Sequence, residues 1–119
     1  MSSISKYFKR KEFACRCGCG FETVDIELLE VLEDVREHFG KPVVINCACR
    51  CEQHNAEVGG AKGSKHKLGI AADIRVKDVE PDRVFSYLDS KYSTTYGVGR
   101  YHTFTHIDVR STLARWDNT

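Results

Sequence analysis

The sequence has no apolar run close to the roughly 20 residues that a membrane-spanning helix requires, so we expect no membrane span. Its first residues, MSSISKYFKRKEF, contain no apolar segment of the kind found at the centre of a secretory signal. We therefore expect synthesis in the cytoplasm, and any action beyond the cytoplasm would depend on release or delivery by another component.

An excess of one charge is also lacking. Lysine and arginine together number 18, against 17 aspartate and glutamate residues, which gives a formal net charge of +1. This balance argues against nucleic-acid binding through general charge attraction. The 119 residues are 41% hydrophobic and contain no internal repeat or linker. They predict a single domain over residues 1–119, and they carry no signal for an oligomeric state.

Cysteine, in contrast, is abundant, with six residues in two alternating triplets: Cys15, Cys17 and Cys19, then Cys47, Cys49 and Cys51. Three interpretations are open. Disulfides between the triplets would need an oxidising compartment. A structural zinc ion could use four thiolates, although C-x-C is tighter than the usual C-x₂₋₄-C spacing. Buried thiols could instead pack as small hydrophobic side chains. A second, structural ion at the cysteines is thus one alternative, and not the favoured one.

Helical periodicity is clearest in residues 23–40, where four hydrophobic residues recur on one face: Leu28, Leu32, Val35 and Phe39. Thr23 or Asp25 is expected to cap the start of this helix, and Gly40 to end it.

Strand patterns occur at three places in the remaining sequence. Residues 42–46 predict a buried strand, and residues 71–76 and 104–109 alternate between polar and apolar side chains, as half-buried strands do. Helices are expected near residues 52–59 and 80–92. This order predicts an α+β domain with a small, mainly antiparallel sheet flanked by helices.

One loop and two of these strands can be combined into a metal site on the sheet face. His66 and Asp73 are too far apart along a straight helix to share an ion, but a bend at Gly69 would return His66 toward the strand that carries Asp73. His106 lies on the polar face of the later strand. Two imidazoles and one carboxylate leave a fourth tetrahedral position for water, as catalytic zinc sites require, although iron or manganese could also use these ligands.

The same region resembles a known family. Ser64, His66, Gly69, Ala71 and Asp73 follow the pattern S-x-H-x-x-G-x-A-x-D. This pattern resembles the signature of the zinc D-Ala-D-Ala carboxypeptidases, the M15-type peptidases that include phage endolysins and murein peptidases. HID at residues 106–108 is similar to that family's second metal motif, and EFACRCGCGF, INCACRCEQHN and GVGRYHTFTHIDVR resemble its small single-domain branch. The resemblance implies the D-Ala-D-Ala peptidase/hedgehog-like fold and one catalytic Zn²⁺ held by His66, Asp73 and His106.

The resemblance also implies roles for two polar residues beside the metal. Arg50 matches an arginine that faces the substrate near the scissile carbonyl, where a guanidinium can stabilise an oxyanion or hold a terminal carboxylate. Ser64 matches a motif serine that contacts the substrate backbone or braces the loop. A hydroxyl that only caps a turn is the structural alternative for Ser64.

The general base is where the sequence departs from the family pattern. Many members carry Asp or Glu three residues before the last histidine ligand, and Thr103 stands at that position here. Asp108 shares a strand face with His106 and is the favoured substitute for proton transfer, with a purely structural contact to His106 as the alternative. His102, whose ordinary pKa suits proton transfer, is a further substitute.

Together these features predict a zinc-dependent metallopeptidase that hydrolyses a peptide bond of D-Ala-D-Ala or L-Ala-D-Glu type in peptidoglycan stem peptides. We expect it to act on the cell wall after release, as an endolysin does, or as part of a phage particle. Thr103 and the cysteine triplets motivate one alternative from another class. In that alternative the chain is a catalytically weak or inactive, metal-stabilised binding or structural module, for example a phage particle component.

Overall fold

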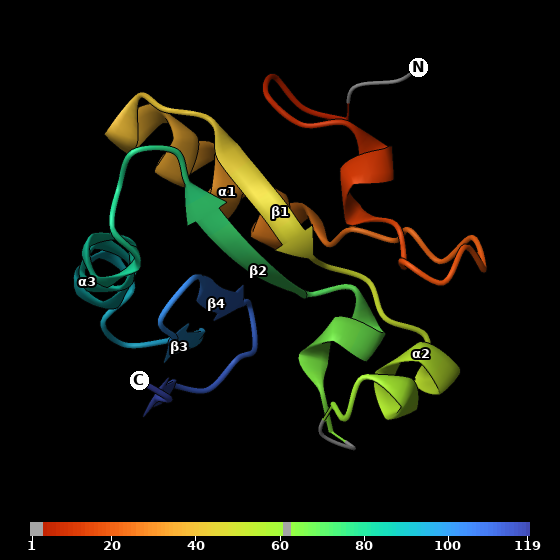
Figure 1. The fold of residues 1–119 in the computed structure, drawn as a ribbon. Helices are drawn as coiled ribbons and strands as arrows, with labels where there is room; N and C mark the ends of the chain where they lie inside the picture. The colour runs from red at the N-terminus through yellow and green to blue at the C-terminus, as the bar shows by residue number, and fades with distance from the viewer. Residues whose placement is uncertain (1–3, 61–62) are drawn as a thin grey trace.

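The computed structural model describes residues 4–60 and 63–119. These residues form, in chain order, η1 (Arg10–Phe13), α1 (Ile26–Phe39), β1 (Val43–Cys47), α2 (Glu52–Glu57), η2 (Lys65–Leu68), β2 (Ala71–Val76), α3 (Pro81–Lys91), β3 (Gly97–Arg100), β4 (Thr105–Asp108) and β5 (Ala114–Asp117). Figure 1 shows β1 and β2 side by side, with α1 behind them and α3 beyond the far side of β2. The predicted α+β class is confirmed, and so is the predicted succession of helices and strands.

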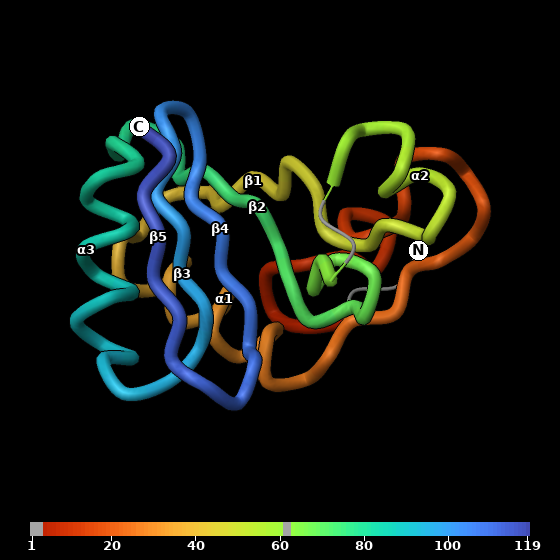
Figure 2. Tube along the Cα trace, turned by 90° about the horizontal axis from the view of Figure 1, so that it is seen from below, coloured from red at the N-terminus to blue at the C-terminus, as the bar shows by residue number. Residues whose placement is uncertain are grey.

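The five strands form one mixed sheet in the order β1-β2-β4-β3-β5. The neighbouring pairs β1–β2, β2–β4 and β3–β4 are antiparallel. Strand β5 adds to the edge beside β3 in parallel, and Figure 2 shows it next to β3 on the side of α3. The sheet is therefore mainly antiparallel, as predicted, with a parallel edge strand that the sequence pattern did not reveal.

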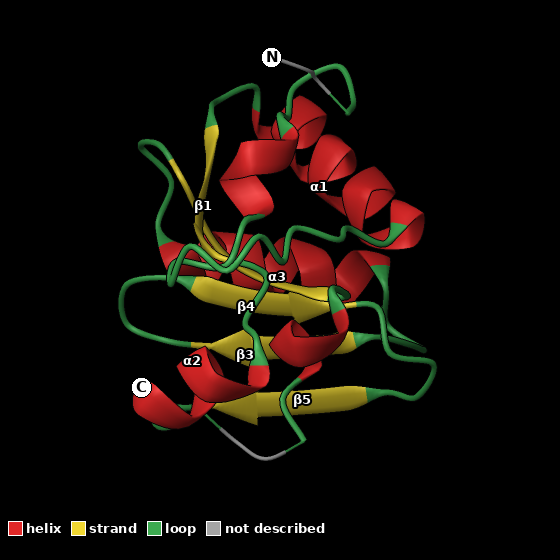
Figure 3. Ribbon diagram, turned by 90° about the vertical axis from the view of Figure 1, so that its right-hand side faces the viewer, coloured by secondary structure: helices red, strands yellow, loops and turns green. Residues whose placement is uncertain are grey.

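Helices cover the sheet on both faces, and the core lies under α1 and α3. Figure 3 shows α3 behind the sheet and α2 in front of it. The apolar stripe of α1 is buried through Leu28, Leu32 and Val35. The alternation in β2 buries its apolar residues in the core and leaves Asp73 on the opposite face, where the side chain is 15% exposed. The strand pattern thus points a carboxylate away from the core and toward the side of α2.

The ends of α1 follow from local chemistry. The Asp25 carboxylate accepts a hydrogen bond from the backbone N–H of Glu27 at 2.8 Å, which satisfies one of the free donors of the first turn. Gly40 ends the helix in the left-handed conformation, with φ of 64°. Of the two predicted caps, Asp25 fills the position. None of the helices in residues 4–60 and 63–119 combines the length and apolar character needed to cross a bilayer.

The segment before α1 packs against the loop that follows β1. Phe8 and Phe13 are buried in the core, and the Cys49 N–H donates to the Phe13 carbonyl at 3.0 Å. Residues 16–19 form turns and bends, so the first cysteine triplet does not line one face of a strand. This packing places the N-terminal segment beside the loop that leads into α2.

Candidate metal centre

A tight turn carries His66 to the sheet. Ser64 caps η2, and the helix ends at Gly69, whose φ of 72° is left-handed, as the bend expected at this glycine requires. A Cβ at Gly69 would lie 2.8 Å from the carbonyl oxygen of Thr23, so the neighbouring backbone also selects glycine. The turn leaves His66 buried beside the start of β2.

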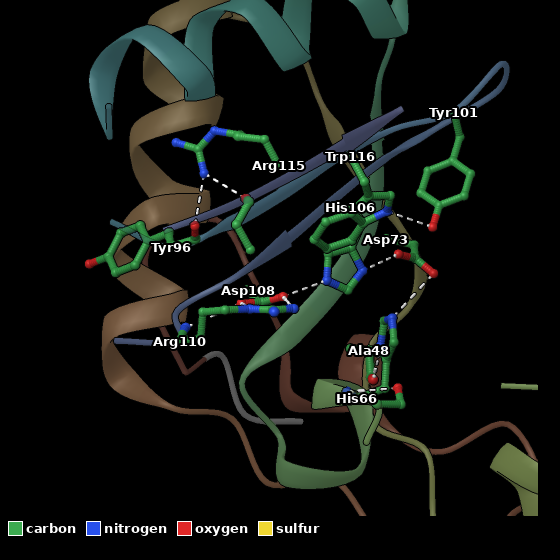
Figure 4. Close-up of polar contacts among 12 residues, drawn as sticks. Ala48, His66, Asp73, Tyr96, Tyr101, His106, Asp108, Arg110, Arg115 and Trp116 are labelled. Atoms are coloured by element: carbon green, nitrogen blue, oxygen red, sulfur yellow. Dashed lines mark hydrogen bonds and ion pairs between the residues drawn. The ribbon is translucent and has the colours of Figure 1, made fainter. Parts of the chain in front are cut away.

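Strand register brings the other two predicted ligands together. In the antiparallel pair of β2 and β4, Asp73 lies opposite His106. Because side chains of directly paired residues point to the same face of a sheet, both project toward the turn that carries His66. Figure 4 shows the Asp73 carboxylate between the two imidazoles.

The three side chains are in close contact. Nε2 of His66 lies 3.3 Å from Oδ2 of Asp73, and Nδ1 of His106 lies 3.0 Å from Oδ1 of the same carboxylate. The two rings are nearly perpendicular, at 81°, with centroids 5.1 Å apart. Each imidazole therefore presents a nitrogen to one oxygen of Asp73.

The remaining nitrogen of each ring is held by a fixed acceptor. His66 donates from Nδ1–H to the Ala48 carbonyl at 2.7 Å, and His106 donates from Nε2–H to Oδ2 of Asp108 at 2.8 Å. Such contacts fix the tautomer, so that the nitrogen facing Asp73 is the one with a lone pair to offer. Nε2 of His66 is buried and makes no hydrogen bond with any residue in the described part of the chain.

The chemistry of this donor set suits a zinc ion. Zn²⁺ binds imidazole nitrogen and carboxylate oxygen, and catalytic sites use three such protein ligands. A lone pair on His66 that faces a carboxylate oxygen at 3.3 Å is unfavourable unless a cation satisfies both groups. The unsatisfied nitrogen of His66 is thus the kind of group that a bound metal would complete.

Cys47 is a neighbour that the sequence analysis did not connect with this site. It ends β1, pairs with Asp73 across the strands after an irregularity in register, and its sulfur lies within 4.8 Å of ligand atoms of His66 and Asp73. Burial raises the pKa of its thiol. The position of Cys47 in a cysteine triplet obscured this contact, which depends on pairing between distant strands.

Acidic and basic side chains alternate across the site, in the order Asp73, His106 and Asp108. Burial raises the pKa of Asp73, but contacts with His106 and His66 outweigh burial and lower that pKa to about 2. Burial lowers the pKa of His106, and the carboxylates of Asp108 and Asp73 raise it above its ordinary value. Without a metal, the two flanking carboxylates therefore favour the protonated imidazole of His106, and the neutral tautomer with its lone pair on Nδ1 is the form that would bind a metal.

Asp108 is the buried end of this row and does not face the solvent. It is fully buried, and Arg110 donates to it from Nε and Nη2, both at 2.7 Å. These hydrogen bonds and that of His106 hold the pKa of Asp108 well below its ordinary value against the effect of burial. Asp108 contacts the Nε2 side of His106, whereas Asp73 contacts the Nδ1 side. This geometry favours the structural contact over direct proton transfer.

The other two base candidates lie in the turn between β3 and β4. Thr103 and His102 are both exposed, and neither is among the described residues that line the cleft beside Asp73. Within that lining, as far as the structure describes it, Asp73 is the one carboxylate.

The predicted ligands lie at the floor of a cleft of about 610 Å³, within the range of ordinary ligand sites. The described polar and aromatic residues that line it are Arg50, Ser64, Lys65, His66, Asp73, Tyr101, Phe104, His106, Arg110 and Trp116.

Arg50 and Ser64 both reach this cleft and both contact the turn of His66. The backbone N–H of Arg50 donates to the carbonyl of His66 at 3.1 Å. The guanidinium Nε of Arg50 is buried and has no hydrogen-bond partner among the described residues. The hydroxyl of Ser64 accepts from the backbone N–H of His66 at 3.3 Å, so Ser64 braces the turn as well as lining the cleft.

An aromatic wall completes the cleft, and the sequence analysis did not assign it. Trp116 of β5 lies with its ring centroid 5.0 Å from that of His106, and its Nε1–H donates to the Tyr101 hydroxyl at 2.9 Å. Tyr101 stacks on Phe104 at 4.4 Å. These aromatic residues lie in a short loop and at a sheet edge. They could be recognised as a wall of the cleft only once β5 was known to lie beside β3.

The comparison with known families agrees with this geometry. The sequence matches the family described as Peptidase M15 over residues 6–108, which includes His66, Asp73 and His106. No curated protein matches the chain. The family is one of zinc-dependent peptidases, so the coarse prediction of a zinc metallopeptidase is confirmed, and the chain belongs to the peptidase M15 family.

Proposed function

We propose that this protein hydrolyses a peptide bond in peptidoglycan stem peptides, of D-Ala-D-Ala or L-Ala-D-Glu type, with one zinc ion held by His66, Asp73 and His106. One observation carries the proposal. Nδ1–H of His66 and Nε2–H of His106 each donate a hydrogen bond to a fixed acceptor, and the other nitrogen of each ring faces the Asp73 carboxylate in an open cleft. Membership in the M15 family supports the peptidase chemistry.

A zinc ion bound there would lower the pKa of a water ligand to about 7 and polarise the scissile carbonyl. The residues of the chain supply the surroundings. The hydrogen bond from Nε2–H of His106 to Asp108 keeps the proton on that nitrogen and leaves Nδ1 unprotonated for the metal. The two hydrogen bonds from Arg110 hold the Asp108 carboxylate in place. Asp108 and Arg110 therefore act as positioning residues for His106.

Arg50 supports recognition of an anionic or carbonyl-bearing peptide. Its buried Nε has no partner within the described residues, and the side chain lines the same cleft as Asp73. A guanidinium can bind the terminal carboxylate of a stem peptide with paired hydrogen bonds or stabilise the oxyanion formed at the scissile carbonyl. The Tyr101 hydroxyl, oriented by Trp116, is a further hydrogen-bonding group for the substrate. Ser64 completes the rim, where it braces the turn of His66 and can contact the substrate backbone.

The site of action follows from this substrate. A peptidase for stem peptides acts on the cell wall, either after release as an endolysin or as part of a phage particle. The partner of the cleft is then a peptidoglycan peptide and not a nucleic acid, which agrees with the net charge of +1.

The test uses purified stem peptides and intact murein. The zinc-loaded protein is incubated with each substrate, and mass spectrometry identifies new termini, which also assigns the bond that is cut. The His66→Ala variant is expected to lose cleavage, whereas His38→Ala, which replaces an exposed histidine of α1, is expected to retain it. Equal cleavage by the parent and His66→Ala would refute the metal assignment.

A second candidate function rests on a specific pair of observations. Asp73 is the one carboxylate among the described residues of the cleft, and the sulfur of Cys47 lies close enough to His66 and Asp73 to act as a further protein donor. A site closed by four protein ligands serves structure and not catalysis. A protein that retains zinc at this site but cleaves no stem peptide would favour this metal-stabilised binding or structural module.

A further inference from the structure

We propose that Cys15, Cys17, Cys19 and Cys51 bind a second, structural zinc ion, separate from the site at His66, Asp73 and His106. The four sulfur atoms all lie within 4.8 Å of one another. This cluster unites the whole first cysteine triplet with the last member of the second triplet, although 31 residues separate Cys19 from Cys51.

The distances between the sulfur atoms agree with tetrahedral coordination. Sulfur ligands at about 2.3 Å from a tetrahedral zinc ion are about 3.8 Å from one another. The sulfurs of Cys15 and Cys17 are 3.4 Å apart, and those of Cys17 and Cys51 are 3.6 Å apart. None of the six cysteines forms a disulfide, and a sulfur–sulfur bond would require about 2.05 Å. The cluster therefore has the dimensions of a metal site and not of a covalent bridge.

The backbone is shaped to gather these sulfurs. The Gly18 N–H donates to the Cys15 carbonyl at 3.1 Å, and Gly18 has a φ of 83°, a conformation that glycine adopts without strain. This turn overcomes the short C-x-C spacing, which is unfavourable for a shared ion only when the chain is extended. Backbone N–H groups of Cys51 and His54 point at the sulfurs of Cys15 and Cys51, each at 3.4 Å. Such donors stabilise thiolate ligands.

The exposure of these cysteines argues against a role as ordinary hydrophobic core residues. Cys49 is buried, and its thiol donates to the Thr23 carbonyl at 2.9 Å, as expected of an inert thiol in a core. Cys17 and Cys19 are exposed, and Cys51 is half-buried. Exposed thiols contribute little to a core, so their convergence with Cys15 needs another explanation, which shared coordination of one ion provides.

The position of the cluster gives the ion a structural role. Cys51 directly follows Arg50 and lies three residues after Ala48, whose carbonyl holds Nδ1 of His66. Figure 2 shows the N-terminal segment beside α2, on the side of the molecule opposite α3. A zinc ion at the four sulfurs would fasten residues 15–19 to the loop at residues 48–51. That loop in turn positions the cleft arginine and one of the proposed metal ligands.

The experiment measures metal content and ligand type in the full chain. Protein purified without added metal is expected to contain about two zinc ions per chain by elemental analysis. After exchange with Co²⁺, the cysteine site is expected to give intense thiolate-to-cobalt charge-transfer absorption, because Co²⁺ in a tetrahedral sulfur site is distinguished spectroscopically from Co²⁺ bound by nitrogen and oxygen. Cys17→Ser and Cys19→Ser replace exposed residues and are expected each to lose one ion and this absorption. Cys49→Ser is the matched control and is expected to retain both.

The two sites are tested independently. The double variant His66→Ala with His106→Ala is expected to keep about one zinc ion and the full thiolate absorption. The proposal is overturned if parent and Cys19→Ser bind equal zinc, if cobalt exchange gives no thiolate absorption, or if mass spectrometry of the purified chain finds these cysteines in disulfides. If the parent cleaves no stem peptide but shows the thiolate absorption, the second ion stands and the peptidase assignment alone fails.

Discussion

Asp108 and His106 are joined by a hydrogen bond of 2.8 Å between the carboxylate and Nε2 of the imidazole, on the side of the ring away from Asp73. Arg110 holds the same carboxylate through Nε and Nη2. A carboxylate fixed in this way orients the imidazole and increases its basicity toward a metal. Asp108 therefore positions the metal ligand His106 and does not itself contact the substrate.

We expect Asp108→Asn to weaken zinc binding at the histidine site about 10- to 100-fold, because the amide orients His106 without the negative charge. Competition with a metal chelator measures this affinity. At saturating zinc, the pH profile of stem-peptide cleavage should keep its shape, because a positioning residue does not itself accept the proton. Asp89→Asn, at an exposed carboxylate that pairs with Arg115, is the control and should leave zinc affinity unchanged. Unchanged affinity together with loss of the acidic limb of the profile would identify Asp108 as the base.

Arg50→Ala is expected to lower kcat/KM for stem peptides about 100- to 1,000-fold while zinc content stays the same, because the guanidinium would act on the substrate and not on the metal. A loss confined to KM would indicate binding of a terminal carboxylate, and a loss confined to kcat would indicate stabilisation of the oxyanion. Arg75→Ala removes an exposed arginine of β2 and should change neither constant. Retention of full activity by Arg50→Ala would remove this residue from the proposed site.

Cys47→Ser tests whether the histidine site has an open coordination position. Serine is close in size to cysteine but is a poor zinc ligand. If His66, Asp73 and His106 are the complete protein ligand set, zinc affinity and cleavage should stay within about threefold of the parent. Elemental analysis and the peptide assay measure both. A large loss of zinc from this variant would mean that the cysteine sulfur, which lies within 4.8 Å of ligand atoms of His66 and Asp73, closes the site.

Gly97→Ala tests how tightly β3 packs on Asp108. A Cβ at Gly97 would lie 2.5 Å from Oδ2 of Asp108 and 2.7 Å from Nε of Arg110. Since the Asp108 carboxylate is fully buried, it has little room to move, and we expect the free energy of unfolding to fall by about 1–3 kcal/mol. Gly63→Ala is the matched control, because a Cβ there meets no atom within 4 Å. Urea unfolding of the two variants should therefore give clearly different midpoints.

Features that depend on neighbouring residues were predicted well from the sequence. The apolar stripe of residues 23–40 became α1, because its periodicity and caps are local properties. The bend at Gly69 was expected because a left-handed turn selects glycine, and it carries His66 to Asp73 as the hypothesis required. The alternation of residues 71–76 and 104–109 likewise put Asp73 and His106 on the polar faces of their strands, although the pairing that sets them opposite each other joins distant segments.

Features that depend on pairing between distant segments were missed. Strand β5 is short and lacks alternation, and it exists because β3 offers a free edge. The contact of Cys47 with Asp73 depends on an irregularity in register after Ile45. The gathering of Cys15 with Cys51 depends on a turn that the alternating cysteine pattern concealed, because that pattern also suits an extended strand. No local signal in the sequence determines these contacts.

Arg100 joins the edge strand to α3, and this link predicts a loss of stability in acid. It binds Asp117 of β5 and Asp82 of α3, each at 2.8 Å. Hydrogen bonds from the side chain and backbone of Thr119, followed by the contact with Arg100, lower the pKa of Asp117 to about 2. An unfolded aspartate titrates near 3.9, so the folded state favours the ionised carboxylate, and its contribution to stability is present above about pH 4.

That contribution should be lost as the pH falls from about 4 to 2, because the proton then binds folded and unfolded chains alike. We expect Asp117→Asn to be less stable than the parent at pH 7 and equally stable near pH 2, as measured by urea unfolding across this range. Because the pair is exposed, added salt should reduce the difference at pH 7. A stability difference that stays constant from pH 7 to pH 2 would show that the variant acts through the packing of β5. The ionised carboxylate of Asp117 would then not contribute to stability.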